Sequence, residues 1–253
     1  MDISKICSIG YFDKVVVDGY TMAMFSTKGL EITRNETFEN LMKSMNKYSA
    51  CDIVKVRVTI YGESDFNMND DRLLSMRWHR ESNLKLSRIL VNNNDRYALA
   101  YADILVIKSN SHLSYETEQQ KMWTREILNH MDISEDEYTL LDKAIEIKKN
   151  NSIGVLDKVY VNKSFRKCKI SSWIHENIFE IIKSFGMCDV SAVLLIPGDF
   201  SNESESEFGY SKKEYRNMLV QHYKSVGYKF INKAIMCKYR NKKRIQIASN
   251  KKQ

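Results

Sequence analysis

Proline, glycine and paired cysteines are scarce in this chain. Its 253 residues include one proline and nine glycines, and no stretch approaches the roughly 18 apolar residues of a membrane-spanning helix. The five cysteines are an odd number without a CxxC pair, which argues against a disulfide framework or a zinc site and favours a reducing compartment. The start of the sequence, MDISKICSIGYFDK, lacks the apolar run of a signal peptide. We therefore expect a cytoplasmic protein that does not enter a membrane.

Charge and apolar content are those of a globular protein. Hydrophobic residues make up 43% and charged residues 28%, and the formal net charge is +7. A basic balance favours acidic partners, such as nucleic acid, an anionic membrane surface or a phosphorylated cofactor, although solubility alone explains it equally well. The abundance of Asn, Lys and Ile hints at an AT-rich genome, such as that of a virus.

The N-terminal region predicts a mixture of strands and helices. An Asp18-Gly19 turn within residues 15–22 predicts a hairpin, and apolar spacing predicts a helix over residues 36–48. Residues 53–61 alternate as a half-buried strand, with its valines facing in and Lys55, Arg57 and Thr59 facing out. Residues 62–96 are polar and predict long loops around a short helix near residues 84–90.

The rest of the chain alternates strands and helices more regularly. Helices are expected over 115–130, 135–149, 170–185 and 211–225, and strands over 97–108, 154–161, 189–196 and 228–239. Ser134 and Glu137 form a capping-box pattern at the second helix. This order predicts a mixed α/β fold (α+β in its N-terminal extension) with a right-handed parallel crossover. We expect an N-terminal α+β region over 1–95, a second domain over 96–245 and a basic tail over 246–253.

A basic loop lies between the strand that ends at Val161 and the helix that starts near Ile170. The loop Arg166-Lys167-Cys168-Lys169-Ile170-Ser171 holds three positive charges within four residues. A helix N-terminus offers unpaired N–H groups and a partial positive charge, so this loop suits a pyrophosphate. Further along, Tyr223-Lys224-Ser225-Val226-Gly227-Tyr228 predicts a helix that ends at Gly227 before a final strand.

Taken in order, residues 154–240 resemble the acetyl-CoA-binding half of the GNAT superfamily of N-acetyltransferases. The basic loop occupies the place of that family's R/Q-x-x-G-x-G/A motif, and the segment around Tyr223 the place of its A-x-x-x-Y-x-x-x-G-F segment. The resemblance implies a GNAT-like central mixed sheet flanked by helices, with acetyl-CoA as co-substrate. It also implies that the pyrophosphate is bound by Arg166, Lys167, Lys169 and Ser171. Backbone near Tyr160 and Val161 would hold the acetyl carbonyl and the pantetheine arm, and Tyr223 would be the general acid.

Two positions depart from the family motif. Lys169 and Ser171 stand where the family has glycines, which let the backbone approach the phosphates closely. Lys169 either compensates by its charge or blocks the cradle of backbone amides. For the base that deprotonates the amine, we consider Asp157, which by alternation shares a face of its strand with Val155, Val159 and Val161. The alternative is a surface carboxylate at a strand edge.

Two functions remain open at this point. The first is acetyl-CoA-dependent transfer of an acetyl group to an amine of a small molecule, a protein or RNA. The second is a non-catalytic GNAT-like protein, of viral origin in one version, that binds a protein or a nucleic acid through its basic surface. Lys169 divides the two, because a side chain that filled the phosphate cleft would favour the binding protein.

Overall fold

One mixed sheet organises the chain. The computed structural model describes residues 14–25, 36–37, 51–63, 96–130, 133–161, 165–166, 168–184, 189–198 and 211–240. Within these residues, eight strands form a single sheet in the order β2-β1-β3-β4-β5-β6-β8-β7. The strands are β1 (Lys14–Phe25), β2 (Glu36–Thr37), β3 (Ile53–Glu63), β4 (Arg96–Ile107), β5 (Ser152–Val161), β6 (Val190–Leu195), β7 (Lys229–Phe230) and β8 (Met236–Tyr239). The helices are α5 (Glu118–His130), α6 (Glu135–Lys148), α7 (Ile170–Ser184) and α9 (Lys212–Ser225).

Only the contact between β5 and β6 is parallel; the other neighbouring strands in the described sheet pair antiparallel. The parallel ladder is short, because it runs from Ser152 opposite Val190 to Val155 opposite Leu194. β5 continues beyond that ladder to Val161, paired with β4 along its other edge. The helix α7 makes the crossover between the two parallel strands, as the sequence predicts.

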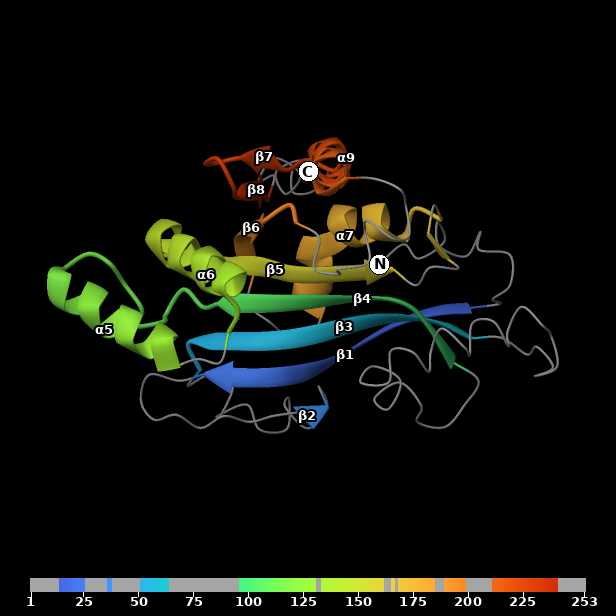
Figure 1. Ribbon diagram of the computed structural model, residues 1–253. Helices are drawn as coiled ribbons and strands as arrows, with labels where there is room; N and C mark the ends of the chain where they lie inside the picture. The colour runs from blue at the N-terminus through green and yellow to red at the C-terminus, as the bar shows by residue number, and fades with distance from the viewer. Residues whose placement is uncertain are drawn as a thin grey trace, which may run out of the picture.

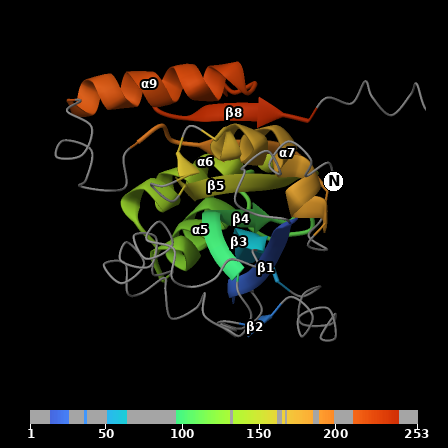
Figure 2. The same ribbon diagram turned by 90° about the vertical axis from the view of Figure 1, so that its right-hand side faces the viewer.

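Two apolar clusters cover the two faces of the sheet. On one face, the buried isoleucines of α7 belong to one cluster with Val54, Val56 and Val58 of β3, and Tyr223 of α9 packs against this cluster. On the other face, α5 and α6 pack Leu128, Leu140 and Leu141 against the sheet. Figure 1 shows α5 and α6 together at one end of the sheet, and Figure 2 shows α9 running beside β8 and next to α7. The described helices are each too short or too polar to cross a bilayer.

Most of the regular pattern is confirmed. The mixed α/β class, the four helices from residue 115 onward and the strands over 53–61, 97–108, 154–161 and 189–196 are all present. Ser134 and Glu137 form the predicted capping box, and Gly227 takes a positive φ of 98° after α9. Of the described strands before residue 96, β3 pairs directly with β4 and β1 pairs with β3, so both belong to the same sheet as the C-terminal strands.

Three predicted elements differ from the structure. The hairpin over 15–22 is wrong: β1 runs straight through, with Gly19 opposite Val58 and the Gly19 N–H donating to the Asp18 carboxylate at 2.7 Å. The long partner strand β3 pairs with all of this segment and overrides the local turn signal. Glu36 and Thr37, expected to start a helix, form β2, while residues 38–48 and the predicted loops from 64 to 95 lie outside the described residues.

The third difference is the final strand, which divides into the hairpin β7–β8. The side chain of Asn232 accepts hydrogen bonds from the N–H groups of Ala234 and Ile235, at 2.9 and 2.7 Å. An Asn side chain that bonds its own backbone in this way stabilises a turn, and the chain therefore reverses between Phe230 and Met236.

Candidate functional site

The end of β5 meets the start of α7 beside a pair of stacked tyrosines. Arg166 donates its Nε–H to the Val161 carbonyl at 3.3 Å, and its guanidinium carbon lies 6.0 Å from the centre of the Tyr160 ring. Tyr160 in turn stacks on Tyr101 of β4, with ring centres 5.4 Å apart. Three of the residues expected to bind the cofactor, Tyr160, Val161 and Arg166, thus lie together at one end of β5. Lys167 lies outside the described residues.

Lys169 adopts a backbone conformation that favours glycine. Its φ is +60°, in the left-handed region, which costs a residue with a Cβ atom on the order of 1–2 kcal/mol. Its carbonyl accepts the Trp173 N–H at 2.9 Å and so begins the hydrogen bonding of α7. Its side chain is exposed rather than packed among described residues. The chain therefore keeps the backbone shape of a glycine loop although the residue is lysine.

Ser171, in the first turn of α7, connects this loop to Tyr223. The Ser171 hydroxyl lies 3.1 Å from His222 Nε2 on α9, and His222 directly precedes Tyr223. The Tyr223 ring is half-buried, and its centre lies 5.0 Å from that of His175 and 6.0 Å from that of Tyr228. Burial raises the pKa of Tyr223 well above that of a free phenol, so the hydroxyl keeps its proton at neutral pH. The neutral phenol can donate a hydrogen bond, and it is a weaker acid than a free tyrosine.

His175 is the fully buried polar side chain behind Tyr223. Its Nδ1 lies 3.4 Å from the Tyr228 hydroxyl, while its Nε2 has no hydrogen-bond partner among the described residues. Burial, followed by the charges of His222 and Lys238, lowers the pKa of His175 to about 3. The Lys238 ammonium donates to the His175 carbonyl at 2.6 Å. The imidazole is therefore neutral at physiological pH, and it packs against the general-acid candidate rather than against solvent.

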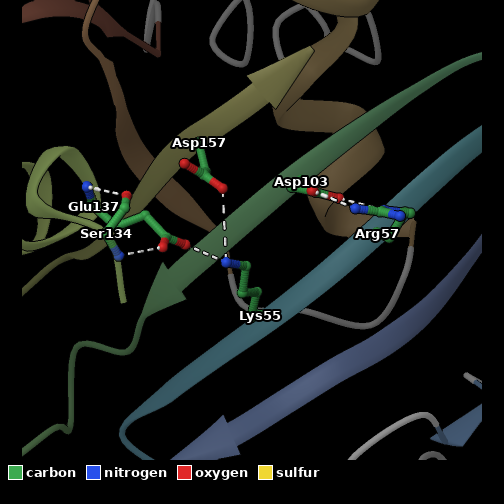
Figure 3. Close-up of polar contacts among 6 residues, drawn as sticks. All are labelled: Lys55, Arg57, Asp103, Ser134, Glu137 and Asp157. Atoms are coloured by element: carbon green, nitrogen blue, oxygen red, sulfur yellow. Dashed lines mark hydrogen bonds and ion pairs between the residues drawn. The ribbon is translucent and has the colours of Figure 1, made fainter. Parts of the chain in front are cut away.

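Asp157 lies on the opposite face of the sheet, at a bulge in β5. Asp103 of β4 is opposite Lys158, and the next residue, Ile104, is opposite Leu156, so Asp157 has no partner in the ladder. The Asp157 carboxylate lies 3.6 Å from the Lys55 ammonium (Figure 3). The bulge also corrects the predicted alternation: Val155 is on the Asp157 face, but Val159 and Val161 pack on the α7 face.

Lys55, Arg57, Asp103, Glu137 and Asp157, which we call the α6-side charge cluster, lie between the sheet and α6 (Figure 3). Arg57 holds Asp103 through two hydrogen bonds of 2.6 Å, and Lys55 donates to the Glu137 carboxylate. Lys55 and Arg57, expected to face out from β3, are instead half-buried: Lys55 reaches Glu137 of α6, and Arg57 lies against Asp103 and the Tyr101 ring.

Burial and the neighbouring carboxylates set the charge of Asp157. Asp157 has only 6% of its surface exposed, and desolvation followed by repulsion from Glu137 raises the pKa of its carboxyl to about 6. Burial alone would raise the pKa of Glu137 as well, but the hydrogen bonds from Lys55 and from the Ser134 backbone hold it below its usual value. Glu137 and Asp157, which share the Lys55 ammonium, therefore ionise in different pH ranges.

The predicted site residues fall into two groups. Tyr160, Val161, Arg166, Lys169 and Ser171 surround the start of α7, and Ser171 reaches Tyr223 through His222. Asp157 and Tyr223 lie on opposite faces of the sheet and do not contact each other. Sequence reasoning missed Lys55, Asp103 and Glu137 as neighbours of Asp157. Of these three residues, Asp103 is the one that the sequence could have pointed to, because its carboxylate interrupts the apolar run of the strand over 97–108.

No family model matches the sequence, and no curated protein matches it. Among solved structures the chain is similar to NAA60 of Arabidopsis thaliana in complex with a bisubstrate analogue, with 9% identity, 90% of this chain and 100% of that chain covered, and a TM-score of 0.35. It is also similar to the KacTA–DNA complex (8% identity, 94% and 99% covered, TM-score 0.33) and to nourseothricin acetyltransferase (8% identity, 94% and 92% covered, TM-score 0.29). Identities and TM-scores this low assign neither a family nor an activity.

Asp157 makes stability depend on pH. Because its pKa is raised in the folded protein, protonation favours folding, and this contribution is lost as pH rises through about 6. Asp157→Asn should therefore stabilise the protein, and the gain should be roughly 2 kcal/mol larger near pH 7.5 than near pH 4. Denaturant unfolding at both pH values measures this difference. The control Glu126→Gln removes an exposed carboxylate of α5 and should give no such difference; a gain for Asp157→Asn that does not change with pH would contradict the assignment.

Proposed function

We propose that the protein is an acetyl-CoA-dependent N-acetyltransferase, with the co-substrate bound where β5 ends and α7 begins. The observation that carries the proposal is the left-handed backbone at Lys169, directly before the first turn of α7. A loop that turns this way before a helix points successive N–H groups toward one place. The position is also the one at which the resemblance to the GNAT superfamily expects a glycine.

The residues around this turn suit a pyrophosphate. The first N–H groups of α7 have no partners within the helix and carry its partial positive charge. Arg166 and Lys169 add cationic side chains, and Lys167 lies between them in the sequence. The Ser171 hydroxyl, which lies near His222, offers a further hydrogen bond. The donor set is therefore one that binds an anion through both backbone and side chains.

The free part of β5 suits the arm of the co-substrate. Beyond Val155, β5 has no described ladder partner on the side of β6, while β4 pairs with its other edge. An extended ligand with amide groups pairs with a strand in the way that an added strand does. Tyr160 and Val161 lie at the end of this edge, where the thioester would be held.

The proposed chemistry is direct transfer. Acetyl-CoA supplies an activated acyl group whose C–S bond breaks as the amine nitrogen bonds to the carbonyl carbon. Tyr223 gives its phenolic proton to the departing sulfur, which suits a hydroxyl that stays protonated at neutral pH. Asp157 takes the proton that the amine loses, which suits a carboxyl with a pKa of about 6. The two act from opposite faces of the sheet on a group at the open edge of β5.

The acceptor is an amine of a small molecule, a protein or RNA, and the basic surface favours one that carries negative charge. The second candidate function is a non-catalytic protein that uses the same fold to bind a protein or nucleic acid. One observation favours it: a lysine stands at a backbone position that suits glycine, as expected where a phosphate loop has been abandoned.

Acetyl-CoA should stabilise the folded protein. A ligand that binds only the native state adds about 2.7 kcal/mol at a hundred times its Kd, so the melting temperature should rise with ligand concentration. Differential scanning fluorimetry with acetyl-CoA measures the shift, with adenosine triphosphate as a control for binding of any polyphosphate. An unchanged melting temperature at millimolar acetyl-CoA would count against the proposal.

Tyr223→Phe should lower the rate of transfer and leave acetyl-CoA binding nearly unchanged. Loss of a general acid typically costs about 10²–10⁴-fold in rate, and the variant keeps the ring that packs against His175. Release of the CoA thiol, measured with an acceptor amine under conditions where chemistry limits the rate, gives the result. Equal rates for the variant and the wild type would remove Tyr223 from the mechanism.

Substitutions at Lys169 separate the two functions. If its charge holds the phosphates, Lys169→Ala should weaken CoA binding by several-fold, and salt should weaken the wild type more than the variant. If its side chain obstructs the loop, Lys169→Gly should tighten CoA binding instead, which would favour the non-catalytic protein.

Lys149→Gly is the matched control for these substitutions. Lys149 is the other described lysine with a positive φ, 44°, and it caps the far end of α6. Its replacement relieves similar backbone strain and should leave CoA affinity unchanged. Calorimetric titration gives the affinities. If neither substitution at Lys169 changes the affinity of a protein that binds CoA, the loop has been placed wrongly.

A further inference from the structure

Asp157 lacks an exclusive partner in the α6-side charge cluster. The cluster has three carboxylates and two cations. Arg57 and Asp103 form a closed pair with two hydrogen bonds of 2.6 Å. Lys55 is hydrogen-bonded to Glu137 and lies farther from Asp157, at 3.6 Å. Asp157 is buried and shares the Lys55 ammonium with Glu137.

Glu137 is fixed from the helix side. One of its carboxylate oxygens accepts the Ser134 N–H at 2.9 Å, and its own N–H donates to the Ser134 hydroxyl at 3.2 Å. The other oxygen takes the Lys55 ammonium. The capping box of α6 therefore aims a carboxylate at the sheet, next to the bulge in β5. This carboxylate competes with Asp157 for the same lysine.

Lys55 is fixed from the sheet side, because β3 pairs with both β1 and β4. Burial alone would lower the pKa of Lys55, but the hydrogen bond to Glu137 and the charge of Asp157 raise it, so the ammonium stays charged. The other charged groups that face Asp157 are Asp103 of β4, which opposes its ionisation, and Lys158 of β5, which favours it. Asp157 is thus held between an attracting lysine and a repelling glutamate.

We infer that Lys55 and Glu137 are positioning residues, which hold Asp157 as a proton acceptor by dividing one ammonium between two carboxylates. This inference rests on the proposed function for its catalytic meaning. A carboxylate in a closed ion pair is a weak base, because its partner stabilises the charged form. Glu137 prevents that by occupying Lys55, and Lys55 keeps Asp157 ionisable by remaining within reach.

An arrangement that served stability alone would leave no excess carboxylate. A buried charge without its own partner is destabilising, often by several kcal/mol, and such groups persist where function requires them. Glu137 need not be charged to cap α6, since glutamine also completes a capping box. It is also not needed to neutralise Lys55, because Asp157 lies within reach of the same ammonium. What the three residues provide is a competition between Glu137 and Asp157 for the Lys55 ammonium.

The first arm of the test is the pH dependence of kcat/KM for acetyl transfer. Glu137→Gln keeps the cap of α6, removes the repelling charge and frees Lys55 for Asp157. The acidic limb, on which activity rises as Asp157 loses its proton, should therefore move to lower pH by roughly one unit. Lys55→Met keeps the aliphatic stem and removes the attracting charge, so the same limb should move to higher pH by a similar amount. A structural role would lower activity or stability without moving the limb in opposite directions.

The second arm does not depend on activity. The carboxyl carbon of Asp157, assigned by its loss in Asp157→Asn, is titrated by nuclear magnetic resonance in protein labelled with ¹³C-aspartate. Its midpoint should fall in Glu137→Gln and rise in Lys55→Met. The matched control is Glu214→Gln, which alters the equivalent capping box of α9 at Ser211, and it should move neither the midpoint nor the limb.

The two arms separate the two ideas. Midpoints that stay fixed, or that move in the same direction in both variants, would overturn the inference. Midpoints that move as expected while the kinetic limb stays fixed would also overturn it, since Asp157 would then not be the base. If the protein transfers no acetyl group, the proposed function is refuted. If the Asp157 midpoint still shifts in opposite directions in the two variants, the control of its ionisation by Lys55 and Glu137 stands.

Discussion

Four residue pairs join β5 to β6, and β5 then continues to Val161 with a described neighbour on one side only. This short parallel ladder is the constraint on which the other features depend. The end of β5, with Arg166 hydrogen-bonded to Val161, lies beyond this ladder, and the turn at Lys169 and the start of α7 follow it in the chain. The bulge at Asp157 also lies beyond the ladder.

The two faces of β5 have different electrostatic character. On the α7 face, Tyr223, Tyr228 and neutral His175 form a buried aromatic group that keeps hydroxyl protons on. On the α6 face, burial and the charges of Glu137 and Asp103 raise the pKa of Asp157 to about 6. Each arrangement lowers stability to some degree. On the α7 face, His175 Nε2 has no hydrogen-bond partner among the described residues. On the α6 face, Asp157 shares its lysine with Glu137.

Sequence periodicity was sufficient for the elements whose burial is regular. The isoleucines of α7 and the capping box at Ser134 follow from local spacing and chemistry, and the structure confirms both. Non-local pairing decided the rest. The Asp18-Gly19 sequence favours a turn, but pairing with β3 keeps this part of β1 extended. The final strand is divided in two because the Asn232 side chain bonds the nearby backbone. The side of Asp157 depends on a bulge that alternation cannot reveal, and its neighbours come from strands and a helix far apart in the sequence.

The amide groups at the start of α7 test the account most directly. Hydrogen–deuterium exchange with and without saturating acetyl-CoA reports on each backbone segment separately, and bound phosphates slow exchange where N–H groups hold them. The account predicts slower exchange over residues 168–171 and at Tyr160 and Val161, with α5 unchanged. Unchanged exchange at the start of α7, whether or not another segment is protected, would contradict it.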